Sequence, residues 1–167
     1  MSEPVHADLT PVHLVFDGEM MLDAPVKVTW RHIVNYPSWQ NYSLVQHISG
    51  EPGQEGEVVL LKKEEGGIEL PSYYARTVKL DPQRRIIWKT YPQERSAEGV
   101  SFGIVEFRVD EAQGKTRFCY HTLYEFLVSH RDESALEAFR QQQAANIEAV
   151  FSSVFPKLIR LVEKDVR

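Results

Sequence analysis

Apolar residues recur at spacings of mostly three and four through the last third of the chain, between Asp132 and Val166. This period is typical of one face of an amphipathic α-helix. The apolar set comprises Leu136, Phe139, Ile147, Val150, Phe151, Val154, Leu158, Leu161 and Val162. At about 1.5 Å per residue, such a helix is roughly 45 Å long. It therefore needs a large apolar surface to lie on, and the rest of the chain must supply that surface.

The region before this helix shows the alternation of apolar and polar residues that indicates β-strands. In the first expected strand, 12–22, Val12, Leu14 and Phe16 share one face, and Gly18 is expected to mark a bulge or bend. Further strands are expected at 45–48, 57–63, 73–80, 85–91, 100–109 and 115–128, with hairpin turns at 81–84 and 110–114.

A short helical insert follows the first strand. Asp23 is expected to be the N-cap of a helix, with Pro25 near its first turn. An apolar stripe continues through Val26, Trp30, Ile33 and Val34, and residues 35–38 then stop the helix. Trp39 is expected in a second short helical turn. The order of strand, helical insert, about six strands and long helix predicts an α+β domain with an antiparallel sheet.

Composition narrows the class of protein. The chain has 167 residues, of which 43% are hydrophobic and 26% charged, as in an ordinary globular domain. We expect a flexible segment at 1–11 and one domain at 12–167. A net charge of −5 argues against a general nucleic-acid surface. The single cysteine, Cys119, excludes an intramolecular disulfide and a cysteine-based metal cluster.

The chain has neither an apolar run of membrane-spanning length nor the layout of a signal peptide at its start. We therefore expect a cytoplasmic monomer or homodimer without a nucleic-acid partner. Phosphate-binding loops, nucleophile elbows and metal-ligand spacings are also missing from the sequence. Neither a metal nor a cofactor is expected.

Several motifs resemble the START/SRPBCC superfamily, which includes polyketide cyclases, birch-allergen-like proteins and lipid-transfer domains. They are residues 21–26 (MLDAPV), 28–30 (VTW), 35–39 (NYPSW), and 80–82 (LDP) followed by 84–88 (RRIIW). The resemblance extends from about Val12 to Val162. It implies the helix-grip fold, in which a curved antiparallel sheet of about seven strands wraps around a long C-terminal helix, with two short helices after the first strand. These motifs are structural and say little about chemistry.

A curved sheet around a helix leaves room for a cavity, and strand alternation predicts which residues face it. In the last hairpin, the uncharged face carries Phe118, Tyr120, Thr122, Tyr124 and Phe126, opposite Gly103, Val105 and Phe107. The other face is mixed and charged, with Arg117, Cys119, His121, Leu123 and Glu125 beside Phe102, Ile104, Glu106 and Arg108. We expect the first face to point towards the long helix and the second towards solvent. His121 and Glu106 then form an outward neighbourhood rather than an acid–base pair.

Candidate catalytic groups are Tyr120, Tyr124 and Arg76. A phenol in a cavity presents an apolar ring and one hydrogen-bonding tip, although both tyrosines also suit a core role. Arg76 facing inward would need an anionic partner such as a ligand carboxylate or enolate, whereas facing outward it is an ordinary surface residue. The pattern leaves open which face of its strand points inward.

Candidate ligand-binding residues combine aromatic walls with a few polar groups: Phe107, Phe118, Tyr120, Tyr124, Phe126, Tyr74, Trp88, Gln143 and Asn146. Trp88 and Trp39 suit wall and core roles equally. Pro156 is expected to kink the long helix near Ser152. The loop 64–69, with its glycine pair, serves either as a lid at the cavity mouth or as a solvated hairpin tip.

Three functions are compatible with these patterns. The first is binding of a hydrophobic, aromatic or polyketide-like small molecule. The second is a cyclase/dehydratase- or lyase-type enzyme acting on such a ligand through tyrosine or arginine groups. The third is a protein-interaction module of the chaperone-activator type, which the lack of a second domain disfavours.

Overall fold

The structure is a computed structural model that describes residues 9–35, 38–40, 42–65, 68–69, 72–94, 98–129 and 132–167. Its elements are β1 (Thr10–Leu22), α1 (Val26–Val34), β2 (Tyr42–Ser49), β3 (Val58–Glu65), β4 (Ile68–Glu69), β5 (Tyr73–Asp81), β6 (Arg85–Pro92), β7 (Gly99–Ala112), β8 (Lys115–Val128) and α2 (Glu133–Lys164). Each strand expected from alternation is therefore present, with its ends shifted by a few residues at most.

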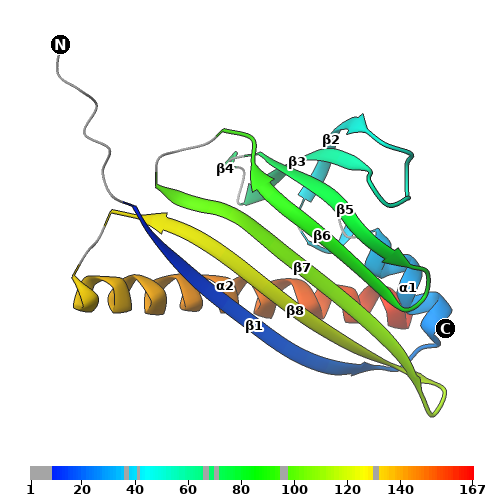
Figure 1. The fold of residues 1–167 in the computed structure, drawn as a ribbon. Coiled ribbons are helices and arrows are strands. Elements are labelled where there is room, and N and C mark those ends of the chain that lie inside the picture. The colour runs from blue at the N-terminus through cyan, green and yellow to red at the C-terminus, as the bar shows by residue number, and fades with distance from the viewer. Residues whose placement is uncertain are drawn as a thin grey trace.

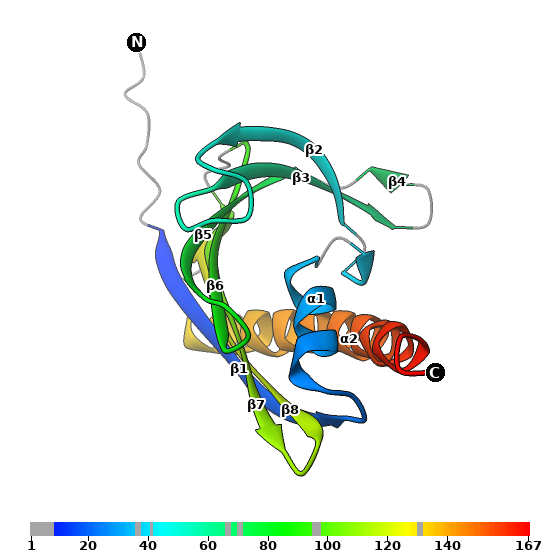
Figure 2. The same cartoon turned by 90° about the vertical axis from the view of Figure 1, so that its right-hand side faces the viewer.

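All the strand pairings are antiparallel, and the strands curl into one sheet. Within the described residues, seven strands follow one another in the order β1-β8-β7-β6-β5-β3-β2, and β4 pairs with β3. The sheet bends so that α1 and α2 both lie on its concave side (Figures 1 and 2). The 32 residues of α2 extend about 48 Å along it. This arrangement confirms the predicted α+β helix-grip architecture.

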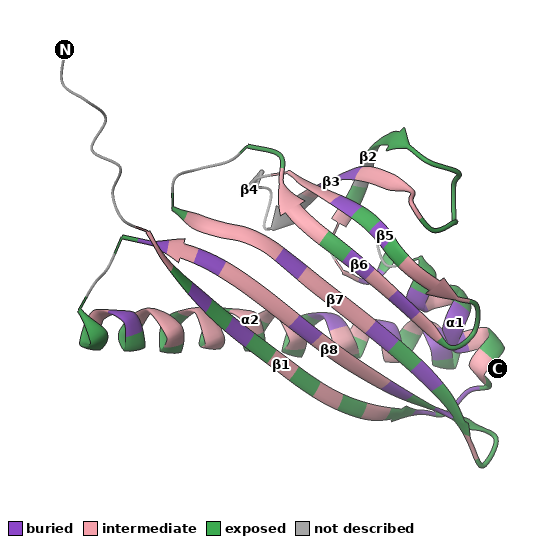
Figure 3. Cartoon of the chain, in the orientation of Figure 1, coloured by how far each residue is buried: buried purple, intermediate pink, exposed green. Residues whose placement is uncertain are grey.

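The long hairpin of β7 and β8 has the predicted register. Gly103 pairs with Tyr124, and Phe107 pairs with Tyr120, while Glu106 and His121 are opposite each other on the outer face. All the buried residues of β7 and β8 belong to the inward-facing set (Figure 3). The face with Phe118, Tyr120, Thr122, Tyr124 and Phe126 points towards α2, as alternation predicts.

A bulge in β5 changes the face of its last residues. Thr77 pairs with Trp88 and Lys79 with Ile87, so Val78 is an extra residue between the two pairs. Before the bulge, buried Ala75 and Thr77 face inward and Arg76 is exposed. After it, Leu80 packs against the core. Simple alternation placed Leu80 on the same face as Arg76, and the bulge separates them.

The core has two parts, one at each end of α2. Near the C-terminal end, Trp39, Phe107 and Phe118 pack against Leu158 and neighbouring apolar residues of the helix. Near the N-terminal end, a smaller cluster combines Val12, Leu14, Phe126, Val128 and Leu136. Between Leu136 and Val154, no residue of α2 is buried. The middle of the helix therefore spans a region that the core does not fill.

Four local predictions need correction or completion. Asp23 is not the N-cap of α1, because Pro25 occupies that position in an extended conformation and no side chain caps the helix. Gly18 makes no bulge, since the register between β1 and β8 continues through it. Thr10 and Pro11 already belong to β1, whereas residues 1–8 lie outside the described residues. The second short helix is represented by a turn at 38–40, beside the undescribed residues 36, 37 and 41.

Two further predictions concern α2 and the loop at 64–69. The helix continues through Pro156 without interruption, and the Ser153 hydroxyl donates a hydrogen bond to the Val150 carbonyl at 2.9 Å. A kink there stays a prediction. The loop is a hairpin in which Glu64 and Glu65 of β3 pair with β4, but residues 66 and 67 lie outside the described residues. Its role as a lid is therefore untested.

Candidate functional site

A cavity of about 300 Å³ lies between the inner face of the sheet and the middle of α2. Its walls are aromatic or aliphatic for the most part, with a few amides and hydroxyl groups. The lining residues are Gln40, Tyr42, Leu61, Tyr73, Ala75, Trp88, Thr90, Val100, Val105, Tyr124, Phe126, Gln143, Asn146, Ile147, Val150 and Phe151. None of these described residues carries a charge. The cavity coincides with the stretch of α2 that has no buried residue.

Small residues in adjacent strands create the hollow. Ala75 of β5 pairs with Thr90 of β6, Thr90 pairs with Gly103 of β7, and Gly103 pairs with Tyr124 of β8. Three small residues therefore stand in one row across the inner face. A row of large residues at these positions would fill the space beneath α2.

Tyr124 lies across this row because Gly103 has no side chain. A Cβ atom at Gly103 would lie 2.9 Å from the Cδ1 and Cε1 atoms of Tyr124 and 2.7 Å from the Thr90 Oγ1 atom. Those distances are shorter than carbon atoms in contact tolerate. The glycine thus allows the tyrosine ring to extend from β8 over β7 towards the middle of the cavity.

A second phenol, Tyr73, reaches the same cavity from β5. Burial raises the pKa of the Tyr73 phenol. Burial also raises the pKa of Tyr124, to about 12, with a smaller contribution from the nearby Tyr73. Both phenols are thus protonated near neutral pH, and each is available as a hydrogen-bond donor. Among the described residues, neither hydroxyl has a hydrogen-bond partner.

The polar stretch of α2 supplies the opposite wall. Gln143 and Asn146 line the cavity, as the sequence pattern predicted. The Gln142 side chain donates a hydrogen bond from Nε2 to the Asn146 Oδ1 atom at 3.1 Å. This bond leaves the Asn146 amide nitrogen as a donor at the cavity edge.

A second cavity of about 450 Å³ lies beneath α1, where Trp30 and Val34 of the helix face Thr77, Leu80 and Ile86 of the sheet. It shares three wall residues with the first cavity: Leu61, Ala75 and Trp88. Trp88 therefore stands between two hollows as well as belonging to the core. Glu57 lines this second cavity, but its carboxylate accepts a hydrogen bond from the Gly53 backbone at 2.8 Å.

Three predicted cavity residues lie in the packed part of the core instead. Phe118 is fully buried and Phe107 nearly so, and neither lines the 300 Å³ cavity. Tyr120 packs on Phe155, with ring centroids 4.7 Å apart, and leans over Gly18 of β1. A Cβ atom at Gly18 would overlap the Tyr120 ring. This ring borders two open depressions beside β1 and does not line the 300 Å³ cavity.

Arg76 and Tyr74 do not face the cavity. Both precede the β5 bulge on the outer side of the sheet, where Arg76 is exposed and Tyr74 packs on Tyr91 with ring centroids 5.4 Å apart. Of the two orientations that the sequence left open for Arg76, the structure shows the outward one. The inward tyrosine of this pair is Tyr73, one position earlier in the chain.

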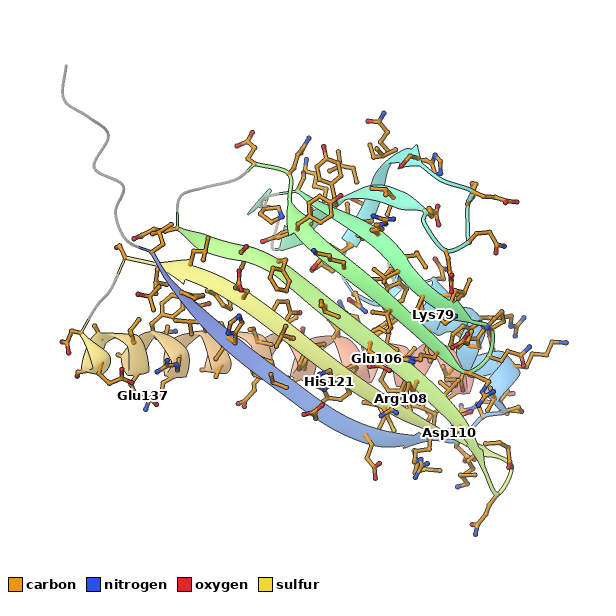
Figure 4. All side chains as sticks on the ribbon, viewed as in Figure 1. Lys79, Glu106, Arg108, Asp110, His121 and Glu137 are labelled. Carbon is orange, nitrogen blue, oxygen red and sulfur yellow. The ribbon has the colours of Figure 1, made fainter. Side chains whose placement is uncertain are left out.

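The outer face of the sheet carries charged pairs, as expected. His121 contacts Asp17 of β1, and the Glu106 carboxylate pairs with the Arg85 guanidinium at 2.7 Å and with Arg108 at 3.7 Å. Glu106, Arg108 and His121 project from this face (Figure 4). These contacts lie on the side of the sheet away from the cavity, so Glu106 and His121 already have partners there.

Sequence reasoning did not single out three residues that line the cavity: Tyr73, Ala75 and Thr90. Two of them are small and one presents a phenol inward. They are recognised as one surface only after the neighbouring strands are aligned. Trp88, Tyr124, Phe126, Gln143 and Asn146 line the cavity as predicted. Their role in binding a ligand stays a prediction.

No protein-family model matches the sequence, and no curated protein matches it. Solved structures do share its fold. One is ZhuI aromatase/cyclase from Streptomyces sp. R1128, with a TM-score of 0.66 and 16% identity over 93% of this chain and 97% of that chain. Another is Ara h 8.0201, with a TM-score of 0.60 and 11% identity over 89% and 99% of the two chains.

A protein from Rhizobium leguminosarum is similar to the same extent, with a TM-score of 0.66 and 15% identity over 93% of this chain and 98% of that one. At these identities the likeness concerns the fold alone. No described helix is both long and apolar enough to cross a membrane. The curled sheet, the long C-terminal helix and these structural neighbours together show that the chain has the helix-grip fold.

Proposed function

We propose that this protein binds a hydrophobic, aromatic or polyketide-like small molecule in the cavity between the sheet and α2. The observation that carries the proposal is the uncharged, largely apolar hollow of about 300 Å³. This volume lies at the lower end of the range of small-molecule sites, which combine apolar walls with a few polar groups. Trp88, Tyr124, Phe126 and Phe151 offer flat surfaces on which an aromatic ring packs favourably.

Binding is favoured over catalysis by the chemistry of the walls. The described lining residues include no carboxylate, histidine, lysine or arginine that would act as a general base. Tyr124 stays protonated, and Arg76 lies on the outer face. A cyclase- or lyase-type reaction at this site would therefore depend on phenols and amides alone. The structural likeness to an aromatase/cyclase supports a ring-shaped ligand without supplying a mechanism.

Filling the cavity tests the proposal. Ala75 is buried and lines both hollows, so the larger side chain of Ala75→Phe would occupy ligand space. The matched control is Val78→Phe, on the exposed outer side of the same strand. We expect 2-ethylnaphthalene to raise the melting temperature of the wild type and of Val78→Phe, but not that of a folded Ala75→Phe variant.

Circular dichroism establishes whether Ala75→Phe folds, and Ala75→Leu provides a smaller filling residue if it does not. The proposal fails if 2-ethylnaphthalene gives no shift in the wild type or shifts the filled variant equally. Chemical conversion of an aromatic ketone by the wild type, lost in Tyr124→Phe, would favour the enzyme instead.

A further inference from the structure

Two phenol groups line the cavity, although a purely apolar ligand would need no hydrogen-bond donor. Tyr73 enters from β5 and Tyr124 from β8, three strands away in the sheet, and both line the same hollow. Each approaches from its own side, and they are close enough for Tyr73 to influence the titration of Tyr124. Neither hydroxyl is hydrogen-bonded to another described residue.

An unpaired polar group in an apolar environment is unfavourable, by about 1–3 kcal/mol for a group left without a partner. The Tyr73 and Tyr124 hydroxyls belong to the same cavity and are not among the fully buried unpaired atoms of the described residues, so water reaches them. A ligand that displaces this water would leave both hydroxyls unpaired unless it accepts their hydrogen bonds. The Thr90 hydroxyl, which stands between them in the row of small residues, makes only a long contact of 3.5 Å with the Gly103 carbonyl. A ligand atom that accepts hydrogen bonds would satisfy both phenols at once.

The residues that line the cavity indicate whether the accepting ligand atom is charged or neutral. No described residue lining the cavity is charged, so a carboxylate placed there would lose hydration without gaining a counter-charge. A carbonyl oxygen has two lone pairs and carries no net charge, and it can therefore accept a hydrogen bond from each of the two phenols.

We infer that Tyr73 and Tyr124 jointly recognise one uncharged carbonyl oxygen of the ligand, so that the protein selects aromatic ketones or quinones over aromatic hydrocarbons and acids. This inference rests on the proposed function, because it names the ligand class of the same cavity. The phenols are donors, and the row of Ala75, Thr90 and Gly103 gives the carbonyl end of the ligand space to approach them.

Three probes of the same ring system separate the inference from the proposed function. They are 2-acetylnaphthalene, 2-ethylnaphthalene and 2-naphthoate, and their affinities are compared by calorimetry near neutral pH. We expect the ketone to bind about tenfold more tightly than the hydrocarbon, from two hydrogen bonds of ordinary net strength. We expect 2-naphthoate to bind at least about tenfold more weakly than the ketone.

The variants Tyr73→Phe and Tyr124→Phe remove one donor each and keep the ring. The ratio of ketone affinity to hydrocarbon affinity should fall about threefold in each and approach one in the double variant. Tyr120→Phe is the matched control, since this ring packs on Phe155 outside the cavity, and it should keep the wild-type ratio.

A wild-type ratio near one, a ratio unaffected in the double variant, or tightest binding of 2-naphthoate would overturn the inference. In each of these cases, binding of 2-ethylnaphthalene would leave the proposed function standing. If none of the three probes binds, both proposals fail.

Discussion

Tyr120 and Tyr124 are four residues apart on the same face of β8, yet the structure gives them different surroundings. Tyr120 leans over Gly18 of the neighbouring β1 and packs into the aromatic core with Phe155. Tyr124 leans over Gly103 of β7, on the other side of β8, and borders the cavity. A glycine on one neighbouring strand or the other thus determines which way each ring turns, and hence whether it serves packing or binding.

The packed core near the C-terminal end of α2 and the cavity beneath its middle should differ most in their response to loss of a large side chain. Phe118 is fully buried among Phe107, Tyr120 and Phe155. Phe118→Ala should lower the free energy of unfolding by about 3–5 kcal/mol, because it leaves a hole in a packed core.

Phe151→Ala is the matching change beside the cavity. It should lower the free energy of unfolding by roughly half as much, since part of that ring already faces the cavity. Urea titration measures both values. Equal losses of unfolding free energy in the two variants would show that Phe118 and Phe151 are packed equally tightly.

Alkaline pH should lower the stability of the protein through deprotonation of Tyr124 at the cavity. Its pKa is about 12 in the folded protein and about 10 in an unfolded chain, so the folded state holds the proton more strongly. The resulting stabilisation is fully present below about pH 10 and is lost as the pH rises through about 12, by roughly 2–3 kcal/mol in total.

Tyr124→Phe removes the titrating group and should lose less stability than the wild type between about pH 9 and about pH 12. Urea unfolding at several pH values gives the slope for each protein, and Tyr120→Phe serves as the control. Identical slopes for Tyr124→Phe and the wild type would place the Tyr124 phenol in contact with solvent.

The glycine pair provides the direct test of the comparison. Gly18→Ala places a methyl group inside the Tyr120 ring, which Phe155 holds from the other side, so we expect a loss of about 1–3 kcal/mol. Gly103→Ala pushes Tyr124 towards empty space, where the ring can move, so the loss should stay below about 1 kcal/mol.

For ligand affinity we expect the reverse order, with the larger effect in Gly103→Ala. Gly103→Ala displaces a cavity wall and should weaken 2-acetylnaphthalene binding, whereas Gly18→Ala should leave it near the wild-type value. Similar effects of the two substitutions on both readouts would contradict the division of roles between the tyrosines.

The smallest effect is expected on the outer face of the same strand. His121 is about half exposed and pairs with Asp17, and exposed ion pairs contribute little to stability. His121→Ala should change the free energy of unfolding by less than about 1 kcal/mol and should leave ligand binding unchanged. A large loss of binding would mean that the charged face takes part in the site.

Much of the fold follows from local patterns in the sequence. The register of β7 and β8 depends on one tight turn and unbroken alternation near it, so pairs such as Phe107–Tyr120 are predictable. The face of β5 is not, because the extra residue Val78 reverses the alternation and makes Leu80 a misleading guide to Arg76.

The difference between Tyr120 and Tyr124 was also beyond local reasoning. Both satisfy the same inward alternation, and the direction of each ring depends on a glycine of another strand. Gly18 is 102 positions before Tyr120 in the chain, and their pairing is known only once β1 and β8 are aligned. The cavity itself depends on small residues from three strands, which no single strand pattern brings together.

The unfilled space beneath the middle of α2 has a consequence for the dynamics of the helix. From residue 137 to residue 153 the helix has no buried side chain, while Leu158 and Val162 are fully buried near its end. Segments with few buried contacts open locally at a lower free energy than the rest of a protein. Backbone amides around Asn146 should therefore exchange hydrogen faster than those around Leu158, and an occupied cavity should slow them. We therefore expect a small molecule to enter and leave the cavity beside this stretch of the helix.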